Sequence, residues 1–178
     1  MNAYNILIAG FGGQGVLFTG KVMAEAGLID NREVTWMPTY GPETRGGTSN
    51  CSVCISDETI GSPLVTRPNV LIVMNSPSYE KYINTIAPGG KIFLNSSIIP
   101  NSRDSGDGVE VYKIPATELS NDQGLEGIAN IIILGKVLKE TGFTSYETIE
   151  KAIQKSVPAR KAHLLEHNLR AIKLGMAL

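Results

Sequence analysis

The chain has 178 residues, of which 42% are hydrophobic and 19% are charged, and its formal net charge is −1. This composition supplies a sizeable core, which excludes a disordered chain, and the charge balance excludes a broadly basic nucleic-acid-binding protein. The two cysteines are too few for a disulfide scaffold, a four-thiolate zinc site or an iron–sulfur cluster. No apolar run approaches the roughly 20 residues of a membrane span, and we see no signal-peptide pattern. We therefore expect one cytoplasmic domain over residues 1–178, with no membrane and no nucleic acid among its partners.

The first third of the chain combines buried strands with one helix. A continuous apolar run at 5–9 is typical of a strand that is covered on both faces. A glycine-rich stretch follows it, then helical periodicity over 16–27 and a short strand at 34–37. Polar and apolar residues alternate over 50–56, which predicts a half-buried strand with 59–61 as its candidate hairpin partner.

The remainder of the chain is expected to add strands and then helices. The strands are predicted at 70–74, 91–94 and 109–114, with a helix that Ser76 and Pro77 begin. Further helices are predicted at 128–138, from the capping-box sequence at 144–147 to about Ser156, and along the apolar stripe formed by Leu165, Leu169, Ile172 and Met176. Strands that alternate with helices predict an α/β fold. We expect a three-layer Rossmann-like domain with a mostly parallel sheet and an antiparallel excursion near residues 49–61.

The glycine-rich stretch is the first candidate site, and it comprises Gly10, Gly12, Gly13, Gln14 and Gly15. It satisfies G-x-G-x-x-G between a strand and a helix, where free N–H groups and the helix dipole favour a phosphate or carboxylate. An NAD site also needs an acidic residue about 20 positions further on, at the end of the second strand. Glu33 lies at the beginning of that strand instead, and no Arg replaces the acid. An anion or cofactor site, an NAD(P) site and a purely structural turn all remain open.

A second candidate site lies in the glycine- and proline-rich segment 40–48, which contains Arg45, Gly46 and Gly47. A guanidinium group binds phosphate or carboxylate with two hydrogen bonds, and glycines let such a loop close on its ligand. Loops that follow the first two strands of an open α/β sheet lie at the same edge, so the two candidate segments are expected to face each other. A surface loop with an ion pair between Arg45 and Glu43 is the alternative.

Three other patterns resemble reactive sites but favour structural roles. Cys51 and Cys54 form C-x-x-C on a strand, where their side chains point to opposite faces. His163 and His167 lack a third metal ligand, so no metal site is predicted, and 106–108 is interpreted as a turn. Asn130 stands inside an apolar helix; because a buried amide needs partners, it either ties down a loop or faces a site. We assign no catalytic residue to this chain.

Four segments, in this order and at these separations, resemble the gamma subunit of 2-oxoacid:ferredoxin oxidoreductases. They are Gly10–Val16, Tyr40–Gly47, Asn95–Ser97 and Ala129–Asn130. The resemblance covers about residues 4–155. Residues 34–38 and 51–53 look most like the 2-oxoglutarate type.

The resemblance implies one subunit of an enzyme that oxidatively decarboxylates a 2-oxoacid to an acyl-coenzyme A and reduces ferredoxin. It places thiamine diphosphate, magnesium and iron–sulfur clusters in alpha and beta partner subunits, with a delta subunit as a further candidate, and none tightly bound by this chain. Coenzyme A is the candidate ligand of the two glycine segments and Asn130, and the isolated chain is predicted to be inactive. A pyruvate or branched-chain version of the complex and a stand-alone NAD(P)-binding protein are the alternatives.

Overall fold

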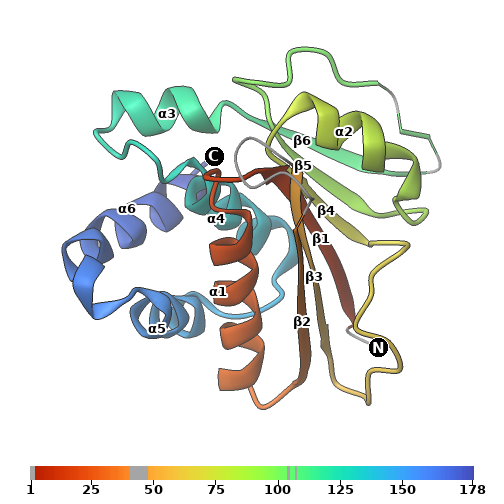
Figure 1. Cartoon of the computed structure of the whole chain (residues 1–178), viewed down its shortest axis with the longest axis horizontal. Coiled ribbons are helices and arrows are strands. Elements are labelled where there is room, and N and C mark those ends of the chain that lie inside the picture. The colour runs from red at the N-terminus through yellow and green to blue at the C-terminus, as the bar shows by residue number, and fades with distance from the viewer. Residues whose placement is uncertain (1–2, 41–47, 104, 107) are drawn as a thin grey trace.

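The computed structural model describes residues 3–40, 48–103, 105–106 and 108–178, although not the side chain of Tyr40. In this part of the chain a six-stranded sheet forms the centre, in the order β2-β3-β1-β4-β5-β6 (Figure 1). The strands are β1 (Tyr4–Phe11), β2 (Glu33–Tyr40), β3 (Thr48–Ser56), β4 (Val70–Val73), β5 (Lys91–Asn95) and β6 (Glu110–Ile114). β1, β4, β5 and β6 run parallel to one another, whereas β3 is antiparallel to both of its neighbours, β1 and β2.

Helices cover the two faces of the sheet unequally (Figure 1). The helices are α1 (Val16–Ile29), α2 (Ser76–Tyr82), α3 (Ala116–Asp122), α4 (Ala129–Thr141), α5 (Tyr146–Ser156) and α6 (Leu165–Met176), with 3-10 turns η1 (Ile83–Thr85) and η2 (Ala159–Leu164). Residues of α1, α4, α5 and α6 pack in one core cluster with Ile6 and Ile8 of β1. The alternate residues Leu7 and Ala9 pack on the other face, against α2 and η1. The predicted three-layer α/β fold is therefore confirmed.

The strand predicted as half-buried is buried on both faces. Cys51, Val53 and Ile55 face the α1 side, while Ser52 and Cys54 on the opposite side are at most 4% exposed. β3 is covered in this way because it lies inside the sheet, between β1 and β2, and its antiparallel partner along the chain is the preceding strand β2. The predicted hairpin partner at 59–61 is accordingly wrong, since these residues form no strand.

Two helix starts differ from the sequence expectations. Asn75, not Ser76, caps α2, because its side-chain oxygen accepts a hydrogen bond from the Ser78 N–H at 2.9 Å. The short helix α3 was not predicted, since it spans only seven residues and its N-cap Pro115 makes no side-chain capping bond. Within the described residues, no helix combines the length and apolar character that a membrane span requires.

The sheet brings the ends of β1, β2 and β3 to one edge. Phe11 at the end of β1 pairs with Thr48 at the start of β3, and Tyr40 at the end of β2 pairs with Ser49. The end of β2 and the start of β3 therefore lie at the edge where the glycine-rich turn begins. That the segment between them faces this turn remains a prediction.

Candidate functional site

The glycine-rich segment forms the turn between β1 and α1 at the carboxyl edge of the sheet. Gly12 and Gly13 are exposed, and Gln14 and Gly15 are half-buried. Gly15 is the N-cap of α1 and adopts a left-handed conformation with φ of 76°. The turn is consequently open to a ligand or to another chain.

The glycines of this turn meet different surroundings. A Cβ atom at Gly10 would lie 2.8 Å from both Gln14 Oε1 and Met74 Cβ, so this position needs glycine for packing. A Cβ atom at Gly12 or Gly13 would find no atom within 4 Å. Gly13 still favours glycine because its φ is 93°, but Gly12 is not among the positive-φ residues. In the described part of the chain, neither space nor backbone conformation requires glycine at Gly12.

The side chain of Gln14 holds the turn together. Its Oε1 accepts hydrogen bonds from the Phe11 N–H at 2.7 Å and from Asn75 Nδ2 at 3.1 Å, and its Nε2 donates to the Met74 carbonyl at 3.1 Å. The amide thus joins the turn to the end of β4 and to the cap of α2. A direct ligand contact of the Gln14 side chain remains a prediction.

Asn130 lies in the first turn of α4 and is 5% exposed. Its Nδ2 donates to the Gly15 carbonyl at 3.2 Å and to Thr19 Oγ1 at 3.0 Å. The Gly15 carbonyl can only accept a hydrogen bond, so the Asn130 amino group is the donor at this contact. The amide fixes the N-cap of α1 from a helix more than a hundred residues later in the sequence.

The N-terminus of α1 presents unused hydrogen-bond donors. No side chain caps it, and its first turn contains no acidic residue. The first backbone N–H of this helix that bonds within the described chain is that of Thr19, which donates to the Gly15 carbonyl at 2.9 Å. The N–H groups of Val16, Leu17 and Phe18 therefore stay available, and together with the helix dipole they favour a negatively charged group.

Two hollows adjoin the glycine-rich turn and share Gly13, Gly127 and Asn130 in their walls. The larger, about 280 Å³, lies between the start of α1 and the η2–α6 segment, and Lys161 and Asn168 reach its lining. The smaller, about 220 Å³, lies beside Asn95 at the end of β5 and beside Thr117 and Ser120 of α3. The candidate site is thus a ridge made by the turn, with a hollow on each side.

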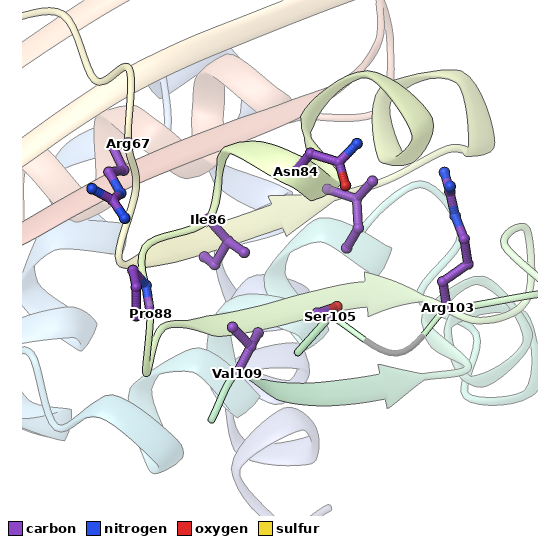
Figure 2. Close-up of a pocket in the computed structure, with 8 residues that line it drawn as sticks. Arg67, Asn84, Ile86, Pro88, Arg103, Ser105 and Val109 are labelled. Carbon is purple, nitrogen blue, oxygen red and sulfur yellow. The ribbon is translucent and has the colours of Figure 1, made fainter. Parts of the chain in front are cut away.

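Figure 2 shows another hollow, of about 340 Å³, which is separate from the glycine-rich turn. Arg67 and Arg103 lie at opposite ends of this hollow, with Ser105 between them. Arg103 forms an ion pair with Glu80. Two residues that line the hollow, Pro88 and Val109, directly precede β5 and β6. The hollow therefore begins at the amino edge of the parallel strands, opposite the candidate site.

The remaining candidates from the sequence are the second glycine segment, the two cysteines and a possible metal site. Arg45, Gly46 and Gly47 lie outside the described residues. Cys51 and Cys54 are free and buried in the two opposite core clusters, which supports their structural interpretation. The described residues contain no group of three His, Cys, Asp or Glu side chains that could hold a metal ion.

Sequence reasoning missed Gly127, Lys161 and Asn168. Gly127 has φ of 80° and directly precedes Ile128, the N-cap of α4, so a glycine before the predicted helix was the available sequence signal in the loop between α3 and α4. Asn168 is 5% exposed beside the apolar stripe of α6, which is the same signal that identified Asn130. Lys161 is an exposed lysine in a 3-10 turn, and nothing local distinguishes it from other surface lysines.

A family model described as pyruvate ferredoxin/flavodoxin oxidoreductase matches residues 5–178. The chain belongs to this family. It is 37% identical over 172 residues to the 2-oxoglutarate synthase subunit KorC of Methanocaldococcus jannaschii, with 96% of this chain and 90% of that protein covered. It is 40% identical over 172 residues to the ketoisovalerate oxidoreductase subunit VorA of Methanothermobacter thermautotrophicus, but it spans only 35% of that longer protein.

Solved structures agree with the predicted fold and subunit type. The gamma subunit of a keto/oxoacid ferredoxin oxidoreductase from Geobacter sulfurreducens superposes with a TM-score of 0.82 at 30% identity, covering 98% of this chain and 96% of that one. A 2-oxoglutarate:ferredoxin oxidoreductase from Magnetococcus marinus superposes with a TM-score of 0.89 at 24% identity, covering 99% of this chain and 31% of that one. The second likeness speaks for the fold alone. The predicted resemblance to gamma subunits of 2-oxoacid:ferredoxin oxidoreductases is confirmed.

Proposed function

We propose that this chain is the gamma subunit of a 2-oxoglutarate:ferredoxin oxidoreductase and that its glycine-rich turn takes part in coenzyme A binding. The complex would release CO₂ from 2-oxoglutarate, join the succinyl group to the thiol of coenzyme A and pass two electrons to ferredoxin. The preference for 2-oxoglutarate rests on KorC relatives that are 33–37% identical and are covered over most of their length. The VorA relative makes a branched-chain 2-oxoacid the alternative substrate.

The chemistry of decarboxylation and electron transfer is assigned to partner subunits. Thiamine diphosphate with magnesium, and the iron–sulfur clusters, would belong to alpha and beta subunits and to a delta subunit where one is present. Neither of the two cysteines is available as a cluster ligand, because both are buried in the core on opposite faces of the sheet. This chain would contribute to coenzyme A binding and to closure of the active site.

The observation that carries the coenzyme A assignment is the uncapped start of α1, which follows the exposed Gly12 and Gly13. Coenzyme A carries phosphate groups, and the free N–H groups of Val16, Leu17 and Phe18 lie at the positive end of a 14-residue helix. The open surroundings of Gly12 let a ligand approach the backbone closely. The Magnetococcus marinus enzyme was solved with 2-oxoglutarate, coenzyme A and succinyl-coenzyme A bound, which agrees with this ligand class.

The sheet order argues against a stand-alone NAD(P) protein. In a dinucleotide-binding fold the second strand lies beside the first, so that its terminal acidic residue reaches the ribose. Here β3 lies between β1 and β2, which moves the end of β2 about 5 Å further away. The end of β2 also carries Thr39 and Tyr40 in place of an acidic residue.

Gly12→Ala tests the proposal in the reconstituted complex. A methyl group at this position meets no atom of the described chain, so the thermal unfolding midpoint should stay unchanged while the KM for coenzyme A rises about tenfold through loss of close backbone approach. Gly61→Ala is the matched control, because it also finds no atom within 4 Å but lies away from the turn. An unchanged KM for coenzyme A in both Gly12→Ala and the bulkier Gly12→Val would contradict the proposal.

A further inference from the structure

A buried amide behind the glycine-rich turn, that of Asn75, makes two hydrogen bonds in different directions. Asn75 lies two residues beyond the end of β4 and is 1% exposed. Its Oδ1 accepts the Ser78 N–H at 2.9 Å, which caps α2, and its Nδ2 donates to Gln14 Oε1 at 3.1 Å. Asn75 is outside the four segments that carry the family resemblance, so its connection with the turn comes from the structure alone.

The partners of these bonds permit one orientation of each amide. A backbone N–H only donates, so the Asn75 oxygen faces Ser78 and its amino group faces Gln14. The Gln14 oxygen must then face Asn75, and there it also accepts the Phe11 N–H at 2.7 Å. The Gln14 amino group is left to donate to the Met74 carbonyl at 3.1 Å. Asn75 therefore sets the orientation of the Gln14 amide.

The Gln14 amide in turn restrains a segment with much backbone freedom. Gly12 and Gly13 are exposed, and glycine has a wider choice of backbone conformations than any other residue. Gly10 leaves room for the restraint, since a Cβ atom there would lie 2.8 Å from Gln14 Oε1. A ligand that binds an already ordered turn avoids the entropy cost of ordering it, and its affinity is higher for that reason.

We propose that Asn75 is a positioning residue for coenzyme A binding. It orients Gln14, and Gln14 holds the exposed glycines in the conformation that receives the ligand. Asn75 itself touches no ligand and acts only through the Gln14 amide. This inference rests on the proposed function and deepens it, because it names a residue behind the site that determines how well the turn binds.

Asn75→Ser in the reconstituted complex separates this role from helix capping. Serine is as good an N-cap as asparagine, so α2 stays capped, but its hydroxyl is too short to replace the bond to Gln14. The KM for coenzyme A should rise about tenfold, the order of one lost hydrogen bond, while kcat at saturating coenzyme A stays unchanged. In the full chain, NMR hydrogen exchange of the Phe11 N–H should become faster, because this N–H is bonded to Gln14.

Asn75→Asp is the second variant, and its effect on the KM should be larger. Aspartate also caps helices well, but it places a carboxylate oxygen opposite Gln14 Oε1, where two acceptors repel each other. The variant therefore turns an attraction into a repulsion at one contact. Its thermal unfolding midpoint is measured alongside, because a carboxylate at this buried position also affects stability.

A double-mutant cycle with Gln14→Met shows whether Asn75 acts through Gln14. Methionine has a similar length without the amide, so Asn75→Ser added to Gln14→Met should raise the KM for coenzyme A no further. Ser145→Ala is the matched control for capping. It removes the side chain that accepts the Thr148 N–H at the start of α5, and it should lower the unfolding midpoint without changing the KM.

Three results would each overturn the inference: an unchanged KM in both Asn75 variants, effects that multiply in the double variant, or unchanged hydrogen exchange at Phe11. The Gly12 variants separate this outcome from failure of the proposed function. A raised KM for coenzyme A in Gly12→Ala, with no change in the Asn75 variants, would retain the function and reject the positioning role. An unchanged KM in the Gly12 and Asn75 variants alike would reject both.

Discussion

At Gly15 the backbone conformation and a neighbouring side chain both require the absence of a Cβ atom. Its φ is 76°, and a Cβ atom would lie 2.3 Å from Asn130 Nδ2. Gly13 has a similar requirement for positive φ, 93°, but has no atom within 4 Å of the Cβ position. The pair therefore separates the cost of backbone conformation from the cost of overlap.

We predict that Gly13→Ala lowers the free energy of unfolding by about 1–2 kcal/mol, the usual cost of a left-handed conformation for a residue with a side chain. Gly15→Ala should cost about 1–3 kcal/mol more, because Asn130 must also move and lose its hydrogen bonds to Gly15 and Thr19. Urea unfolding of both variants measures the difference. Equal losses would show that Asn130 moves aside without cost.

Single residues were predictable where one local pattern determines their place. The G-x-G-x-x-G spacing located the turn and the helix start at Val16 correctly. The two alternatives for Asn130 both have support, since its Nδ2 donates to the Gly15 carbonyl and the residue lines both hollows beside the turn. Lys161 could not be found in this way, because its proximity to the turn depends on the path of η2 between α5 and α6.

At the scale of elements, α4 and α6 approach each other through two glycines. A Cβ atom at Gly135 would lie 2.2 Å from the Ile172 carbonyl oxygen, and one at Gly175 would lie 1.9 Å from the Ile132 carbonyl oxygen. The obstructing atoms are backbone, which cannot turn away as a side chain can. The close contact holds α6, and with it Asn168, beside the α4 helix that carries Asn130.

We predict that Gly175→Ala destabilises the chain although alanine favours helix. The gain in helix propensity is about 0.5–1 kcal/mol, whereas forcing the two backbones apart should cost about 1–3 kcal/mol or more. Thermal unfolding should show a lower midpoint for Gly175→Ala and for Gly135→Ala, with Gly61→Ala as the control. An unchanged or raised midpoint would mean that α6 can shift on α4 freely.

Elements were predicted well where periodicity and caps agree. The capping-box sequence places Ser145 as the N-cap of α5, and its side chain accepts the Thr148 N–H at 3.1 Å. The burial of β3 was underestimated because alternation of Ser and apolar residues normally marks a face exposed to solvent. Here Ser52 is buried and its Oγ accepts the Val65 N–H at 3.2 Å, a partner that only the folded chain brings near.

At the scale of the whole molecule, the insertion of β3 between β1 and β2 decides the shape of the site. The sequence indicated strands and a mostly parallel sheet, but strand order depends on pairings between distant segments. The same insertion places Cys51 at the centre of the sheet, fully buried, with its Sγ 3.6 Å from the Val16 carbonyl oxygen at the start of α1. Because this thiol is buried at the centre of the sheet, its ionisation is coupled to the unfolding of the domain.

Burial raises the pKa of the Cys51 thiol from 9.0 to about 12, an effect that a hydrogen bond with Trp36 partly offsets. A group whose pKa is higher in the folded state contributes stability that is complete below the unfolded pKa and is lost as the pH rises. The unfolded thiol ionises near pH 9, so between pH 9 and 12 it should lower the free energy of unfolding by up to about 1.4 kcal/mol per pH unit. Urea unfolding over this range should therefore show a steeper decline for the unaltered chain than for Cys51→Ala.

The unaltered chain and Cys51→Ala share all other groups that titrate at alkaline pH. The difference between their profiles of unfolding free energy against pH therefore isolates the Cys51 thiol. Cys51→Ala should be less stable at pH 7, because it leaves a cavity between β3 and α1, yet its profile should approach that of the unaltered chain as the pH rises. Cys54→Ala removes a buried thiol on the opposite face and should retain the steep decline if Cys51 is its source. Parallel profiles for the unaltered chain and Cys51→Ala would show that the thiol ionises without disturbing the sheet, and the close packing of β3 against α1 would then need another explanation.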